Sequence, residues 1–208
     1  MAGADPRRWL YLFEYPRSLG IQGRPLEMSE NIVLLDMDGV VCDWKSRMER
    51  DLEDLLGPDK NRLPAITLTR IEYLIRRQPG WYLNLEPLPL GFFIAETLRG
   101  IGFSIMVATK ASPQATNAWS EKVAWCLKHL PYAQVTVSED KTLLYGKILV
   151  DDYQKNADPW LKRRPRGYVI LPDQPWNQGY EHPRVKRVRT PGDVAVLQPL
   201  LQEIFERS

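Results

Sequence analysis

The sequence is poor in several features that would place it in a specialised class of protein. Its 208 residues include only 2 cysteines and 2 histidines, which lack metal-ligand spacing, so neither a disulfide framework nor a zinc site is expected. So few cysteines indicate a reducing compartment, and we expect a cytoplasmic location. No apolar run reaches the roughly 18–20 residues that cross a bilayer, which excludes a membrane protein. The chain also lacks the glycine-rich loop of P-loop kinases and the Gly-x-Ser-x-Gly elbow of serine hydrolases.

A large net charge is also missing. The 28 basic and 26 acidic residues leave a formal charge of +2, which gives no reason to expect a non-specific nucleic-acid binder. The charge is unevenly spread, because residues 160–190 hold eight basic and two acidic side chains. This basic segment is either a surface for a polyanion or partner, or a solvated face that balances acids elsewhere. Nucleic-acid binding therefore stays open for this segment.

Short apolar runs that end in polar residues alternate with helix-like stretches along most of the chain. The runs expected to form strands are 32–35, 103–108, 133–137, 147–150 and 167–171. The stretches expected to form helices are about 90–100, 114–130, 154–163 and 192–207. Strands that alternate with helices predict an α/β fold with a doubly wound, mainly parallel, Rossmann-like sheet.

Two parts of the chain stand apart from this alternation. Residues 44–88 read as helix, Gly-Pro break and helix, which predicts a small helical cap inserted above the carboxyl ends of the strands. Residues 1–30 hold Arg7 and Arg8 before a short apolar run, and form an N-terminal extension that is either a partner-binding arm or an aromatic-rich tail. We therefore expect one domain over 31–208, with its cap at about 44–88, behind this extension.

Acidic side chains gather where two of the expected strands end. Asp36 and Asp38 follow the first strand, and the pair Asp151 and Asp152 follows a later one. Carboxylates brought together raise each other's pKa, and a hard cation with oxygen ligands relieves the repulsion. One such pair alone fits a turn or a helix cap equally well. Two pairs at two strand ends predict a Mg²⁺ site.

Four blocks of sequence then carry a resemblance to a known family. Residues 36–44 (DMDGVVCDW) match the DxDG(V/T) motif of the haloacid dehalogenase-like (HAD) phosphatases. More narrowly, the chain resembles the 5'(3')-deoxyribonucleotidases, in their bacterial and phage-like form, through three further blocks. These are LEPLP at 85–89, EKVAW at 121–125 and DKTLLYGKILVDD at 140–152. The resemblance implies a HAD-like fold with a small helical cap.

The resemblance also implies a catalytic role for four residues. Asp36 would attack phosphorus and form an aspartyl-phosphate, which divides hydrolysis into two easier displacements. Asp38 would protonate the leaving oxygen and then activate water. Thr109 would hydrogen-bond a phosphate oxygen, and Lys141 would balance the charge of the phosphate and the nucleophile.

The metal ligands follow from the same resemblance. Mg²⁺ would be held by the carboxylate of Asp36, the backbone carbonyl of Asp38 and a carboxylate from the second acidic pair. Asp152 is favoured as the direct ligand, with Asp151 as its hydrogen-bonding neighbour or as a ligand itself. The metal would bring two anions together and neutralise charge on the transferred group.

Candidate substrate-binding residues are less specific. Lys110 stands where the family commonly has serine, and as a point charge it could contact phosphate. Lys122, in the EKVAW block, is either a phosphate-side or structural residue or a solvated helix lysine. Trp44, Trp81 and Tyr82 either stack on a nucleobase or form the core of the cap.

These expectations define a function and its alternatives. The leading hypothesis is a Mg²⁺-dependent phosphatase of nucleoside 5'-monophosphates, with deoxyribonucleotides as the expected substrates. The same chemistry on a sugar phosphate or on a terminal phosphate of a nucleic acid is one alternative, and a catalytically silent HAD-fold binding protein is another. Arg76 falls where mammalian members have a pocket tryptophan, so the base preference stays open, as does a homodimer.

Overall fold

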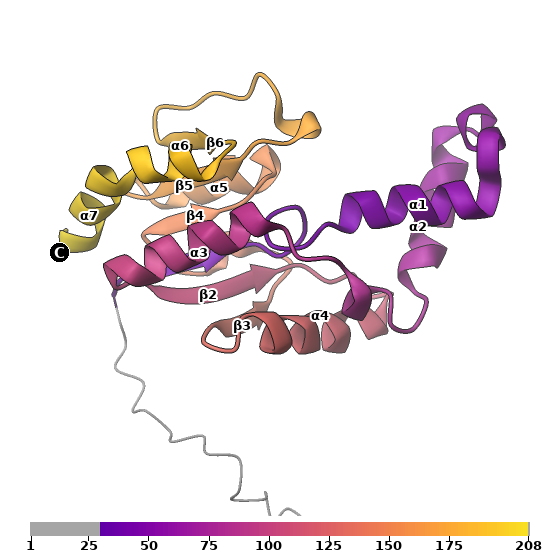
Figure 1. The fold of residues 1–208 in the computed structure, drawn as a ribbon, viewed down its shortest axis with the longest axis horizontal. Helices are drawn as coiled ribbons and strands as arrows, with labels where there is room; N and C mark the ends of the chain where they lie inside the picture. Colours follow the sequence, from indigo (N-terminus) through magenta and orange to yellow (C-terminus); the bar gives the residue numbers. More distant parts are fainter. Residues whose placement is uncertain (1–29, 208) are drawn as a thin grey trace, which may run out of the picture.

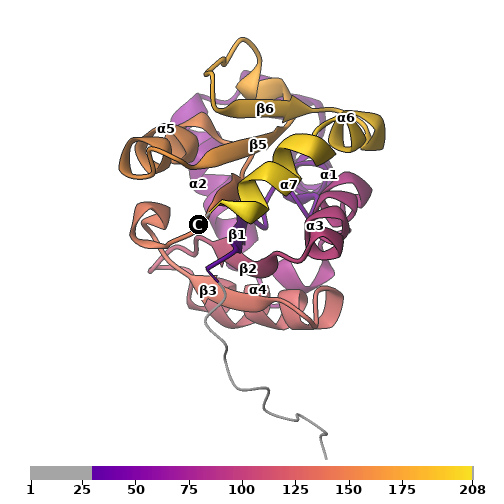
Figure 2. The same ribbon diagram turned by 90° about the vertical axis from the view of Figure 1, so that its left-hand side faces the viewer.

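The computed structural model describes residues 30–207 and shows a six-stranded sheet in the order β3-β2-β1-β4-β5-β6 (Figures 1 and 2). All five pairs of neighbouring strands are parallel. The strands are β1 (Ile32–Leu35), β2 (Ser104–Thr109), β3 (Gln134–Val137), β4 (Ile148–Val150), β5 (Tyr168–Pro172) and β6 (Val185–Val188). From β1 the chain adds β2 and β3 on one side and then β4, β5 and β6 on the other, so the topological switch point lies between β1 and β4. Sheets of this kind bind ligands in the crevice at the carboxyl ends of the two strands that flank the switch point.

Helices cover both faces of the sheet. The α-helices within residues 30–207 are α1 (Trp44–Leu56), α2 (Ala65–Arg76), α3 (Pro89–Ile101), α4 (Thr116–His129), α5 (Gln154–Arg163), α6 (Pro191–Val196) and α7 (Gln198–Glu206). Figure 2 shows α3, α6 and α7 on one side of the sheet and α5 on the other. Because successive side chains of a strand point to opposite faces, Val33 and Leu35 join the core under α3 and α4, whereas Leu34 packs with Trp160 of α5.

The α/β fold with a parallel sheet is confirmed, and the five expected strands are present to within two residues. The expected helix 192–207 is two helices, since Pro199 has no N–H to continue the first of them. Strand β6 was not expected, because its central residues Lys186 and Arg187 read as part of a solvated basic segment.

Much of the basic segment 160–190 is tied to the protein itself. The guanidinium of Arg184 donates to the backbone carbonyls of Arg164 (2.6 Å), Gly167 (2.9 Å) and Leu161 (2.9 Å). Arg187 donates to Asp173 at 2.6 Å and to the side chain of Asn177. These arginines therefore join α5 to β5 and β6, and whether the remaining basic side chains bind a polyanion stays a prediction.

Replacing Arg184 should destabilise the protein. In Arg184→Met three carbonyl oxygens lose a charged donor, and we expect the free energy of unfolding to fall by about 2 kcal/mol. Urea denaturation measures this change, with Lys162→Met on the exposed surface of α5 as the matched control. An Arg184→Met protein as stable as the control would show that the segment is a solvated face.

The insert between β1 and α3 projects from the carboxyl end of the sheet (Figure 1). It comprises α1, α2 and the 3-10 helices η2 (Gly57–Arg62) and η3 (Tyr82–Asn84). The chain leaves and re-enters the core at one place, because Asp43 N–H donates to Glu86 O and Leu88 N–H donates to Val41 O, both at 2.8 Å. This paired crossing holds α1 and α2 over the edge where the strands end.

Residues 1–29 and 208 lie outside the described part of the chain, and the hypothesis of a partner-binding arm falls on them. Within residues 30–207, no helix has the length and apolar character needed to cross a membrane.

Candidate active site

The acidic side chains predicted from the strand ends lie together. Asp36 follows β1, and Asp151 and Asp152 follow the adjacent strand β4. Each of the three offers a carboxylate oxygen that lies within 4.8 Å of the others, and all three residues are buried. The parallel pairing of β1 and β4 thus brings residues that are distant in sequence to one point.

One buried lysine lies between two of these carboxylates. Lys141, in the 3-10 helix η4 (Lys141–Leu143), contacts Asp36 at 2.6 Å and Asp151 at 2.7 Å. Burial raises the pKa of Asp36 to about 6, and the charge of Lys141 opposes that rise. Burial disfavours the ammonium of Lys141 too, but its two carboxylate partners raise its pKa overall, so the lysine stays charged. One positive charge therefore faces three carboxyl groups.

Asp152 faces the open side of the cluster. Its Oδ2 accepts from Nε1 of Trp176 at 3.1 Å, and burial raises its pKa to about 8, with the charge of Asp36 adding to the rise. Gly39 permits this position, since it has a φ of +75° and a Cβ there would lie 2.1 Å from Asp152 Oδ2. Asp151 is wholly buried and accepts from the backbone N–H of Tyr153 at 2.9 Å. Only Asp152 of the pair lines the cavity described below.

The second acid of the first block has a different set of partners. Asp38 forms an ion pair with Lys122, which is 2% exposed and also donates to Thr109 Oγ1 at 3.2 Å. Burial works against the charge on Lys122, but the carboxylate of Asp38 raises its pKa overall. Lys122 is therefore a buried partner of Asp38, and the alternative of a solvated helix lysine is wrong.

The EKVAW block holds the cap against this site from one face of α4. Glu121 accepts from the backbone N–H groups of Gly80 (2.7 Å) and Tyr82 (3.1 Å). Trp125 Nε1 donates to the carbonyl of Leu85 at 2.8 Å. The residues between α2 and α3 are thus fixed by the helix that also supplies the partner of Asp38. Glu121 was not a candidate site residue from sequence, although it is the first residue of the EKVAW block.

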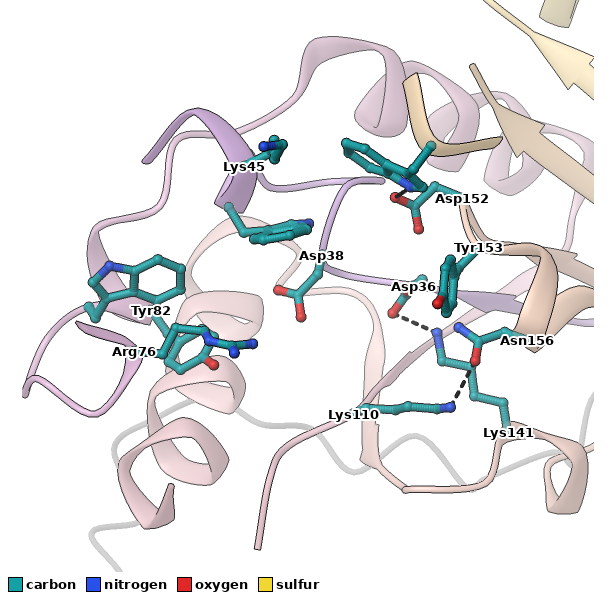
Figure 3. Close-up of a pocket in the computed structure, with 13 residues that line it drawn as sticks. Asp36, Asp38, Lys45, Arg76, Tyr82, Lys110, Lys141, Asp152, Tyr153 and Asn156 are labelled. Atoms are coloured by element: carbon teal, nitrogen blue, oxygen red, sulfur yellow. Dashed lines mark hydrogen bonds and ion pairs between the residues drawn. The ribbon is translucent and has the colours of Figure 1, made fainter. Parts of the chain in front are cut away.

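A cavity of about 490 Å³ opens above these acids, between the sheet and the insert (Figure 3). Asp36, Asp38, Lys141 and Asp152 line its base. Aromatic side chains from the insert and from the sheet side form its walls. They are Trp44, Trp81, Tyr82, Tyr153 and Trp176.

The cavity contains some predicted residues and not others. Trp44, Trp81, Tyr82 and Lys110 line it, but Thr109, Lys122 and Asp151 lie behind its wall. Trp81 is 2% exposed and donates to Asp51 at 2.7 Å, so it belongs to the cap core as well as to the wall. The cap-core interpretation of Trp81 fits this burial, and its stacking on a nucleobase stays a prediction.

Three further lining residues, Lys45, Tyr153 and Asn156, were not candidates from sequence. Asn156 accepts from Lys110 Nζ at 2.8 Å and donates to both oxygens of Asp151 at 3.1 Å, which connects that lysine to the acidic cluster. Asn156 could have been predicted from its position, because it lies in the first turn of the helix that follows the acidic pair. Trp176, which donates to Asp152 at 3.1 Å, also lines the cavity and had no predicted role.

The donor set fits Mg²⁺. The cluster offers carboxylate oxygens only, from Asp36, Asp151 and Asp152, with one ammonium nearby. A divalent cation would balance the two remaining negative charges, and oxygen ligands are those that Mg²⁺ prefers. Because Gly39 has no Cβ, the carboxylate of Asp152 can lie beside it at the edge of the cavity.

The fold is that of the haloacid dehalogenase-like hydrolases. A solved structure titled "putative had-like phosphatase", from Mesorhizobium loti, superposes with a TM-score of 0.52 at 12% identity and covers 84% of this chain and 87% of that one. Within this class, the family model described as "5' nucleotidase, deoxy (Pyrimidine), cytosolic type C protein" matches residues 30–197. The chain therefore belongs to this family of phosphoric monoester hydrolases, as its sequence blocks predicted.

Curated relatives agree with this assignment. A "Putative 5'(3')-deoxyribonucleotidase" of Bordetella bronchiseptica is 27% identical over 163 residues, which cover 71% of this chain and 86% of the relative. The human "5'(3')-deoxyribonucleotidase, cytosolic type" is 25% identical over 140 residues, which cover 58% of this chain and 69% of the relative.

Proposed function

We propose that the protein is a Mg²⁺-dependent phosphatase that hydrolyses nucleoside 5'-monophosphates, deoxyribonucleotides above all, through an aspartyl-phosphate on Asp36. The observation that carries the proposal is the cluster of Asp36, Lys141 and Asp152 at the base of an aromatic-walled cavity. Membership of the nucleotidase family and the names of the relatives support the substrate class. A silent binding protein would have no need of Asp38 beside Asp36, so the retained pair favours an enzyme.

Asp36 is the nucleophile. Its backbone N–H donates to Val150 O at 2.9 Å, and its Oδ1 accepts from the backbone N–H of Met37 at 2.8 Å and from Lys141. A carboxylate fixed by these bonds attacks phosphorus with little loss of side-chain freedom. The bond from phosphorus to the 5' oxygen breaks as the bond to Asp36 forms.

Asp38 moves the proton in both steps. Its carboxyl gives a proton to the leaving 5' oxygen, and the resulting carboxylate then takes a proton from the water that attacks phosphorus. The second displacement releases inorganic phosphate and restores the Asp36 carboxylate. Between the two proton transfers the Asp38 carboxylate is ion-paired with Lys122.

The remaining charged residues bind the phosphate and the cation. Asp36, Asp152 and the backbone of Asp38 would hold Mg²⁺, with Asp151 bonded behind them to Lys141. When bound, the cation offsets the negative charge shared by the nucleophile and the phosphate. Lys110 and Lys141, which line the cavity, stabilise charge on the phosphate oxygens.

The shape of the site supports a nucleoside as the leaving group. Trp44, Trp81 and Tyr82 belong to the insert and line the cavity. Figure 3 shows Tyr82 beyond Asp38 as seen from Asp36, on the side toward which the organic part of the substrate would extend. Aromatic faces stack on any nucleobase, and about 490 Å³ is within the range of small-molecule sites.

Phosphate release in the presence and absence of Mg²⁺ tests the proposal. The purified protein should release phosphate from deoxyribonucleoside 5'-monophosphates faster than from ribonucleotides and sugar phosphates. Chelation should lower the rate at least about 100-fold, and added Mg²⁺ should restore it. Release from sugar phosphates alone would show that the substrate class is wrong, and an unchanged rate in chelator would show that the cation is not required.

The location proposed for this enzyme is the cytoplasm. Cys42 and Cys126 are free and buried in the core. Unpaired thiols of this kind suit a reducing compartment.

A further inference from the structure

We infer that Arg76 is a specificity-determining residue, which favours nucleobases that present two neighbouring hydrogen-bond acceptors, namely guanine and cytosine. The inference rests on the proposed nucleotidase function and names a preference within it. Its basis is a guanidinium that faces the cavity from the cap and has no carboxylate partner among the described residues.

The position of Arg76 is set by contacts at both ends of its last helical turn. Its Nε donates to the carbonyl of Glu72 at 3.3 Å, which directs the side chain along α2. Its own backbone carbonyl accepts from Asn117 Nδ2 of α4 at 3.2 Å, and Tyr73 donates to Gln114 O at 3.3 Å. The end of α2 is thus attached to the core domain, and Arg76 extends into the cavity from a supported helix (Figure 3).

The terminal nitrogens of Arg76 are free to bind a ligand. Within residues 30–207 they donate to no carboxylate and to no carbonyl. The other positive groups at the cavity have partners: Lys141 contacts Asp36, Lys110 contacts Asn156 and Lys45 contacts Glu49. Among these cavity cations, Arg76 is therefore the one whose terminal nitrogens have no protein partner within residues 30–207.

The side of the cavity on which Arg76 lies points to the base rather than to the reacting phosphate. In Figure 3, Asp36, Lys110 and Lys141 lie on one side, Arg76 and Tyr82 lie on the cap side, and Asp38 lies between them. Asp38 serves the oxygen that leaves with the nucleoside, so the nucleoside extends from Asp38 toward the cap. Its base would reach the aromatic wall where Arg76 stands.

The chemistry of a guanidinium then sets the preference. Arginine offers only donors, held in a planar fork, and it binds most strongly to two acceptors side by side. Guanine presents O6 next to N7, and cytosine presents O2 next to N3. Adenine places an amino donor beside N7, and thymine or uracil places an N–H between two carbonyls, so the fork meets one acceptor and one donor. A bidentate pair of this kind changes relative affinity by roughly tenfold or more.

A kinetic comparison of the four deoxyribonucleoside 5'-monophosphates tests the inference. The wild type should show kcat/KM for dGMP and dCMP about tenfold or more above that for dAMP and dTMP. Arg76→Met should remove most of this difference by raising KM for the preferred pair. Arg76→Lys keeps the charge but not the fork, and it should lose the preference as well.

The control is Arg77→Met, the same change one residue later, at an exposed position that packs on Tyr73 outside the cavity. It should retain the wild-type ratios of kcat/KM.

Equal kcat/KM for all four nucleotides in the wild type, or an Arg76→Lys protein that keeps the full preference, would overturn the inference while leaving the nucleotidase function intact. Release from no nucleotide at all would overturn the function and the inference together. A loss in Arg76→Met confined to nucleoside 3',5'-bisphosphates would show that Arg76 binds a second phosphate instead.

Discussion

Asp36→Asn should lower phosphate release from every substrate by at least about 10⁴-fold, because an amide cannot displace the 5' oxygen from phosphorus. The substitution keeps the size of the side chain and its place after β1. The amide oxygen of the substituted side chain can still accept from the backbone N–H of Met37. Phosphate release under saturating dTMP or dGMP measures the loss, and mass spectrometry of acid-quenched protein should show a phosphorylated chain in the wild type only.

The same variant should fold at least as well as the wild type when Mg²⁺ is absent. Burial raises the pKa of Asp36 to about 6, above the ordinary value of 3.8, so the native state loses stability as the pH rises between these two values. Above pH 6 the charged carboxylate therefore opposes folding, and the neutral amide removes that cost. Thermal denaturation in chelator at pH 8 checks this expectation.

Asp54→Asn, the same change on the exposed surface of α1, is the control for both measurements and should leave rate and melting temperature unchanged. More than a tenth of wild-type activity in Asp36→Asn would assign the nucleophile to another carboxylate of the site. A large fall in melting temperature would show that Asp36 contributes to stability rather than to chemistry alone.

The base of the site could be predicted from sequence because its residues follow strands. A buried apolar run identifies a central strand, and the residues after it must lie at the carboxyl edge of the sheet. Asp36, Asp152 and Lys141 therefore lie where their motifs placed them. The outcome for Lys122 was open, because a lysine on an amphipathic helix gives no sign of whether it meets a carboxylate distant in sequence.

The walls of the site could not be predicted in the same way. The insert has no strand to set its position, and α2 is fixed by Asn117 and Gln114, each 41 residues away in the chain from its partner. The direction in which Arg76 points depends on these long-range contacts. Strand β6 escaped prediction for a related reason, since Arg187 is neutralised by Asp173 only after the chain has folded.

Lys141→Met should have the largest effect on stability among substitutions at the site. It removes the ammonium that lies between Asp36 and Asp151, with its side chain 2% exposed, and leaves three buried carboxyl groups without a positive partner. Breaking a buried ion pair by removing one partner costs about 3–5 kcal/mol. We expect a loss of about 3 kcal/mol or more in chelator at pH 8, measured by urea denaturation.

The loss should be smaller in Mg²⁺ if the cation binds these carboxylates, because binding to the native state alone stabilises it by mass action. The activity should still fall about 10²- to 10³-fold, since no side chain replaces the charge of Lys141 on the phosphate.

Lys128→Met, on the exposed surface of α4, makes the same chemical change away from the site and is expected to alter neither the stability nor the activity. If Lys141→Met were as stable as this control in chelator, the carboxylates would not depend on Lys141. If Mg²⁺ stabilised neither the variant nor the wild type, the acidic cluster would not be where the cation binds. Stability and rate therefore test separately the two functions that this one lysine is proposed to serve, which are to hold the acids together and to stabilise the phosphate.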